Sequence, residues 1–173
     1  MALDSIVLVL VRWIHFAAAF TVIGAIFTSV IVLTPVMKTL QPEVRGSITV
    51  KLLPRMIRVQ IAAALVLMAA GVALAVPRSV GDYQVFLNTK WGLAILTGGI
   101  LTLVMFFNAL LIARPTIKRL VKALSHAGEK PPSATTGPLA EVVKLQNTLN
   151  RVIPTNFVLA LIILFLMGFA AHG

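Results

Sequence analysis

Two cationic or ionisable side chains, Arg12 and His15, lie inside an otherwise apolar stretch from Ser5 to Thr34. Residues three apart share one face of a helix. His15 follows Ser5 by a helical rise of about 15 Å, which is deeper than interfacial water reaches. Polar groups at this depth are costly and normally mark sites. The imidazole therefore needs a partner, and Lys90 reaches a similar depth at the start of a later apolar stretch.

One arrangement uses all three side chains, namely a haem b near the outer face of a membrane. His15 would bind the iron, and the propionates would face Arg12 and Lys90, because histidine is a common haem ligand and arginine matches carboxylates. Such a site predicts electron transfer or redox sensing. The second axial position stays open, since His172 lies near the surface. Small residues could admit the macrocycle or simply allow close helix packing: Ala17, Ala18, Ala19 and Gly24.

Two other interpretations of His15 remain. Copper is the alternative metal, because histidine and methionine suit Cu(I). The methionines are scattered along the chain, however, and methionine in apolar helices usually fills packing gaps. The simplest interpretation is a structural histidine that is hydrogen-bonded to a neighbouring helix.

A second polar layer is expected toward the opposite face of the membrane. It contains Arg58, Gln60, Asn108 and Asn156. These side chains could form a site, but amides often join helices to each other and arginine at a helix end often extends toward water.

Composition indicates the elements that must carry these residues. Hydrophobic residues make up 59% of the 173 residues, charged residues 12%, and the mean hydropathy is +1.00. These values indicate a single integral membrane domain, residues 1–173, in the cell (plasma) membrane. Because a helix needs about 20 apolar residues to span a bilayer, the sequence predicts an all-α, four-helix antiparallel bundle. The expected multi-pass helices are 5–34, 57–76, 91–112 and 153–171, with Pro35, Pro77 and Pro115 as expected helix ends.

Charge asymmetry predicts the orientation of the bundle. Twelve of the fifteen Lys and Arg residues fall between the first and second segments, at the very start of the second, or between the third and fourth. The positive-inside rule then places both termini on the non-cytoplasmic side. The net charge of +10 favours anionic lipids at the cytoplasmic face over nucleic acid as the partner.

The cytoplasmic loop 115–152 has an internal organisation of its own. Ile117, Leu120, Val121 and Leu124 recur at helical spacing among basic residues, which predicts an amphipathic helix. This helix either continues the third segment or lies on the membrane surface. Residues 128–138 are rich in Pro, Gly, Ser and Thr and are expected to form a flexible linker. No internal repeat is evident, although two helical hairpins in tandem would be compatible with an ancient duplication.

Several function classes are disfavoured. The chain has no cysteine and only five carboxylates, none inside an apolar segment. The sequence disfavours a hydrolase, because it contains neither a Ser nucleophile elbow nor an HExxH motif. It also disfavours an ordinary proton-driven carrier, which would need a membrane-embedded acid. An enzyme, if this is one, would be a membrane redox protein.

Three stretches resemble the copper-resistance protein D family and related small four-helix membrane proteins. They are WIHFAAAFTVIGAIFTSVIVLTPVMKTL, LLPRMIRVQIAAALVLMAAGVAL and TKWGLAILTGGILTLVMFFNALLIARP. The resemblance implies copper tolerance or uptake, or haem-linked redox chemistry, with His15, Arg58 and Lys90 at matching positions. The chain lacks a Met-rich or His-rich exported segment and has four helices where longer members have eight.

Two classes of function follow from the sequence. The first is a cofactor-bearing redox or sensing protein. The second is an accessory or scaffold subunit that joins a second copy or a larger membrane complex, and copper or solute transport is a further alternative.

Overall fold

The computed structural model describes residues 2–79, 84–127 and 137–172. Within those ranges the chain is helical except at Leu40, Gln41 and Thr89. The elements in chain order are α1 (Ala2–Phe27), η1 (Thr28–Leu33), α2 (Thr34–Thr39), α3 (Pro42–Ser79), α4 (Gln84–Asn88), α5 (Lys90–Phe107), η2 (Asn108–Ala113), α6 (Arg114–Ala127) and α7 (Gly137–His172). Among the residues that the structure describes, four helical stretches are long and apolar enough to cross a membrane. The prediction of an all-α chain with four long apolar helices is confirmed.

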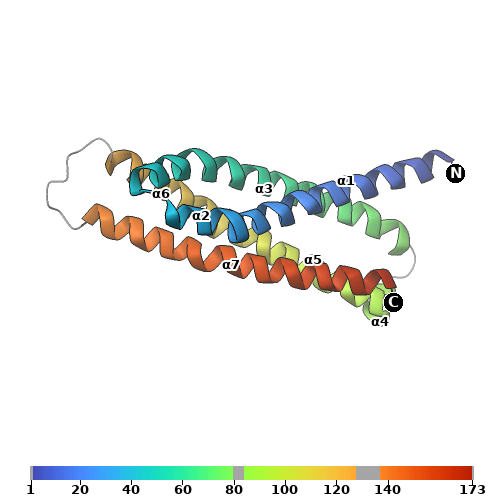
Figure 1. The fold of residues 1–173 in the computed structure, drawn as a ribbon. Coiled ribbons are helices and arrows are strands. Elements are labelled where there is room, and N and C mark those ends of the chain that lie inside the picture. The colour runs from blue at the N-terminus through green and yellow to red at the C-terminus, as the bar shows by residue number, and fades with distance from the viewer. Residues whose placement is uncertain (1, 80–83, 128–136, 173) are drawn as a thin grey trace.

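The elements form four rods that pack in two pairs (Figure 1). The first rod, α1–η1–α2, packs along α3, and the third rod, α5–η2–α6, packs along α7. Contacts of α6 with α3 and of α1 with α7 join the two pairs. Both chain termini lie at the same end of the bundle in Figure 1. We call this end the terminal end and the opposite one, where α2 and α6 lie, the basic end.

The helices do not end at Pro35 or Pro115, contrary to the expectation from the sequence, whereas α3 ends at Ser79, two residues beyond Pro77. Pro35 and Pro115 each follow a six-residue π-helical segment, η1 or η2, and the rod continues beyond them. Proline has no N–H and its ring clashes with the carbonyl four residues earlier. In the π segments the backbone N–H groups of Thr34 and Arg114 donate instead to the carbonyls five residues earlier. The wider turn accommodates each proline inside a continuous rod.

This geometry reveals a repeat that is not evident in the sequence. Each half of the chain contains a rod with a π segment ending two residues before a proline, followed by a second long helix with an internal proline, Pro54 in α3 and Pro154 in α7. Both halves run in the same direction along the bundle, as Figure 1 shows. The fold is therefore two similar helical hairpins packed side by side.

The best-buried core lies at the basic end. Leu120 of α6 is 1% exposed and belongs to an apolar cluster that also includes Ile57, Leu145 and Leu149. The amphipathic segment of residues 115–127 thus continues the third apolar segment as α6, with its apolar face against α3 and α7. Nearer the terminal end, large apolar side chains such as Phe20, Leu111 and Phe165 are exposed, as expected for a surface that meets lipid. The linker predicted at 128–138 lies mostly outside the described residues.

Candidate functional site

His15 lies at the contact between α1 and α3. Its side chain is half-buried, and Nδ1 is 3.1 Å from the main-chain carbonyl oxygen of Leu67. A carbonyl oxygen can only accept a hydrogen bond, so Nδ1 carries the proton and donates. In the neutral ring this leaves a lone pair on Nε2. The hydrogen bond therefore fixes the ring orientation and leaves one nitrogen able to bind a metal.

Gly71 makes this position of the imidazole possible. A Cβ atom at Gly71 would lie 3.3 Å from Cε1 and 3.6 Å from Nδ1 of His15. The first distance is tighter than ordinary van der Waals contact, so the ring occupies the space that a larger side chain would need. The sequence interpretation of His15 did not include Leu67 or Gly71. A glycine among alanines inside an apolar helix was the only signal, because it permits close approach of another element.

Arg12 and Lys90 are both exposed and lie on different rods. Arg12 is on α1, one turn from His15, while Lys90 is the first residue of α5, which packs along α7. The preceding residue, Thr89, caps α5 by accepting a hydrogen bond of 2.9 Å from the backbone of Gly92. Within the described part of the chain, no hydrogen bond or ion pair links Arg12 or Lys90 to His15. The start of α5 and the N-terminal half of α1 do share the terminal end of the bundle (Figure 1).

In the structure Arg58 is separated from the other three residues of the inner polar layer. Asn108 Nδ2 donates to Asn156 Oδ1 at 3.2 Å, which joins the third rod to α7. Arg58 is exposed, and its Nε donates to the carbonyl of Pro54 in its own helix at 3.0 Å. Gln60 faces a central cavity. Asn156 also lines this cavity, so Gln60 and the Asn108–Asn156 pair lie around one space, whereas Arg58 does not line it.

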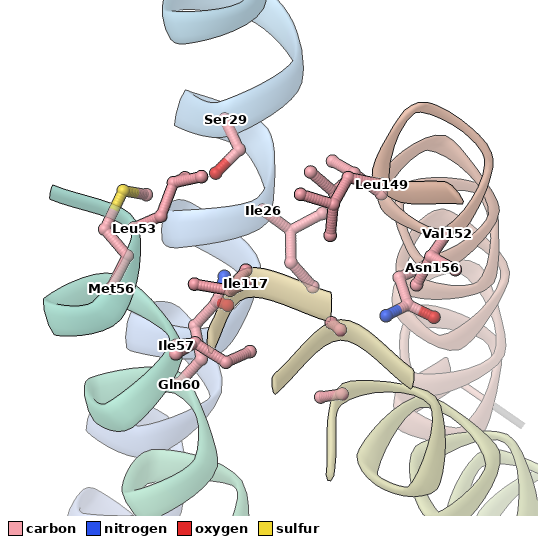
Figure 2. A pocket seen from close by; sticks show the side chains of 13 residues that line it. Ile26, Ser29, Leu53, Met56, Ile57, Gln60, Ile117, Leu149, Val152 and Asn156 are labelled. Carbon is pink, nitrogen blue, oxygen red and sulfur yellow. The ribbon is translucent and has the colours of Figure 1, made fainter. Parts of the chain in front are cut away.

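The central cavity has a volume of about 50 Å³ and lies between all four rods (Figure 2). Three polar side chains line it: Ser29 from η1, Gln60 from α3 and Asn156 from α7. Its other walls are apolar. Of these polar residues, Ser29 was not anticipated, since a serine in an apolar helix carries little information by itself.

Metal ligation by side chains alone has little support in the structure. Among the described residues, no group of three or more His, Cys, Asp or Glu side chains is placed to hold an ion. A haem makes a smaller demand on the protein, because the porphyrin supplies four nitrogens and the protein only the axial ligands. His15 fits that demand through its available Nε2.

Comparisons with family models, with curated proteins and with solved structures found no match to this chain. The likeness to the copper-resistance protein D family accordingly remains a resemblance in sequence pattern.

Proposed function

We propose that this chain is a membrane protein of the plasma membrane that binds a haem b through His15 and acts in electron transfer or redox sensing. The hydrogen bond from Nδ1 of His15 to the Leu67 carbonyl supports the proposal most directly. Histidines that bind metals commonly donate their other ring N–H to a carbonyl or carboxylate, which sets the tautomer and the ring orientation. A half-buried imidazole oriented in this way is suited to an axial position.

In this proposal Arg12 and Lys90 are the cations for the haem propionates. Both are exposed at the terminal end. Haem, when bound, supplies one-electron redox chemistry, and the chain supplies the ligand, the apolar surroundings and the cationic partners. Copper held by His15 and methionine would need further ligands, so haem is the better-supported cofactor.

The proposed orientation has the terminal end on the non-cytoplasmic side. The basic end then lies in the cytoplasm, where its exposed cations would meet the head groups of anionic lipids. These exposed residues include Arg55, Arg58, Arg114, Lys118, Arg119 and Arg151.

Replacing His15 tests the proposed function. We expect the detergent-purified wild-type protein, expressed with ample haem, to show a Soret band, and His15→Ala to lack it because the iron loses its ligand. The matched control is His126→Ala, which removes a histidine of α6 at the opposite end of the bundle. A colourless wild-type protein, or equal haem content in His15→Ala and the control, would refute the haem proposal.

A further inference from the structure

We propose that the central cavity is a hydrated binding site for a small uncharged hydrogen-bonding molecule, either water itself or a small neutral solute. This site is separate from His15 and does not depend on the haem proposal. Its position between the two hairpins, its polar side chains and its apolar boundaries carry the inference.

The two hairpins contribute corresponding positions to the cavity. Ser29 and Ala109 are each the second residue of a π segment, and Leu53 and Ile153 each precede the internal proline of the following helix. Similar repeats that meet face to face commonly enclose a binding site between them in membrane proteins. Local π segments are also frequent at functional sites. The cavity therefore lies between the two hairpins, which is where membrane proteins built from repeats commonly form a binding site.

The polar side chains at the cavity retain unused hydrogen-bonding capacity. Asn156 is 9% exposed, and its Oδ1 accepts from Asn108, which leaves both hydrogens of Nδ2 available. Gln60 forms no hydrogen bond within the described residues. Ser29 donates to the carbonyl of Ala25 at 2.7 Å, so its oxygen can still accept. Figure 2 shows the nitrogen of Asn156 and the amide of Gln60 directed into the space between α3 and α7.

This combination of groups selects the class of ligand. Donors and an acceptor are both present, and none of the lining side chains is charged. A buried ion without a charged partner is strongly disfavoured, so the ligand should be neutral. The cavity volume of about 50 Å³ corresponds to about two water molecules, since each takes about 30 Å³ in the liquid. A polar cavity of this size with several partners is expected to hold water, or one small solute in its place.

Apolar clusters border the cavity in both directions along the bundle. Toward the terminal end lies the cluster of Ile26, Met105 and Ala160, in which Ala160 is 2% exposed. Toward the basic end the cluster that contains Leu120 and Leu145 continues from the cavity wall. The polar groups are therefore confined to one layer, and a molecule bound there would be held between two dry layers.

Cysteine reactivity tests this proposal, because the chain has no cysteine of its own. Ser29→Cys places a thiol at the cavity, and Ala160→Cys places one in the adjacent apolar cluster, one helical turn from Asn156. The probe is methyl methanethiosulfonate, which is small and uncharged. The thiolate is the reactive form and apolar burial disfavours it. We therefore expect modification of Ser29→Cys to be faster by about tenfold or more, as for one unit of thiol acidity.

A second substitution shows whether the cavity causes the difference. In the Ser29→Cys background, Gln60→Met conserves side-chain volume but removes the amide, and we expect it to slow modification. Urea is then added as the solute probe. Protection by urea would indicate a solute site, whereas fast modification without protection would indicate water alone. Equally slow reaction at both cysteines, or a rate that Gln60→Met leaves unchanged in variants that elute as the folded wild type does, would overturn the proposal.

Discussion

Replacing Leu120 by aspartate is expected to disrupt the basic end of the bundle. Leu120 is 1% exposed and contacts the apolar cluster through which α6 packs on α3 and α7. Truncation of such a leucine to alanine typically costs about 2–5 kcal/mol. A carboxylate buried there without a partner would cost several kcal/mol more by the usual cost of burying charge. Hydrogen exchange should therefore accelerate across residues 114–127 and 142–152.

Arg119→Asp is the matched control, because it introduces the same residue at the exposed neighbouring position. Surface substitutions of this kind usually change stability by no more than about 0.5 kcal/mol. Exchange near the terminal end should change little in either variant, since the Leu120 cluster does not extend there. If Leu120→Asp and Arg119→Asp exchange at the same rate, the packing assigned to α6 is wrong.

Replacing Gly71 by valine is expected to displace His15 from α3. The first carbon of any side chain at this position already comes within 3.3 Å of the imidazole, and the branched methyl groups of valine extend farther. Overpacking of this kind typically costs about 1–3 kcal/mol. The ring should lose its hydrogen bond to the Leu67 carbonyl. In the haem-binding account, the Soret band should then weaken or disappear together with a fall in melting temperature.

Gly46→Val is the control for this prediction. Gly46 lies in the same helix, and no atom lies within 4 Å of a Cβ built there. Its valine variant should keep the Soret band and should not lose stability, because valine has a higher helix propensity than glycine. If Gly71→Val had the same Soret band and the same melting temperature as Gly46→Val, the close contact between His15 and α3 would not be what orients the imidazole.

Hydropathy allowed the four long helices to be predicted, because the bilayer leaves few alternatives for a long apolar stretch. The helix ends could not be predicted in the same way. A proline such as Pro35 or Pro115 normally indicates a helix end, because it lacks an N–H donor. Here the wider turn of the π segment accommodates each proline, and the rods continue. Whether such a turn forms depends on the packing of the whole rod and not on the proline alone.

The behaviour of the amphipathic segment also depended on tertiary structure. The same pattern of apolar and basic residues suits a helix on a membrane and a helix in a bundle. The partner faces on α3 and α7 decide between these outcomes, since they bury Ile117 and Leu120. The repeat was hidden for a related reason. Corresponding cavity positions carry different residues, such as Met56 and Asn156, so similarity exists in backbone geometry and not in residue type.

The sequence indicated His15 correctly as a residue that needs a partner, but it could not identify that partner. The acceptor is a backbone carbonyl, which every residue has, so its position depends on how α1 crosses α3. The position of Arg12 on the same helix face as His15 could be predicted from helical periodicity alone. The pairing of Lys90 with His15 assumed that two rods approach each other. The structure places Lys90 at the start of α5, and among the described residues no hydrogen bond or ion pair links it to His15.

The most direct test of haem ligation at His15 is chemical rescue of His15→Gly. This variant opens a space where the imidazole lay, so added imidazole can bind haem iron in its place. We expect His15→Gly to show no Soret band, and millimolar imidazole with haem to restore the band and the dithionite-reduced spectrum of the wild type. Haem binding by His15→Gly without imidazole, or no restoration by imidazole in a folded variant, would contradict the assignment of His15 as the axial ligand.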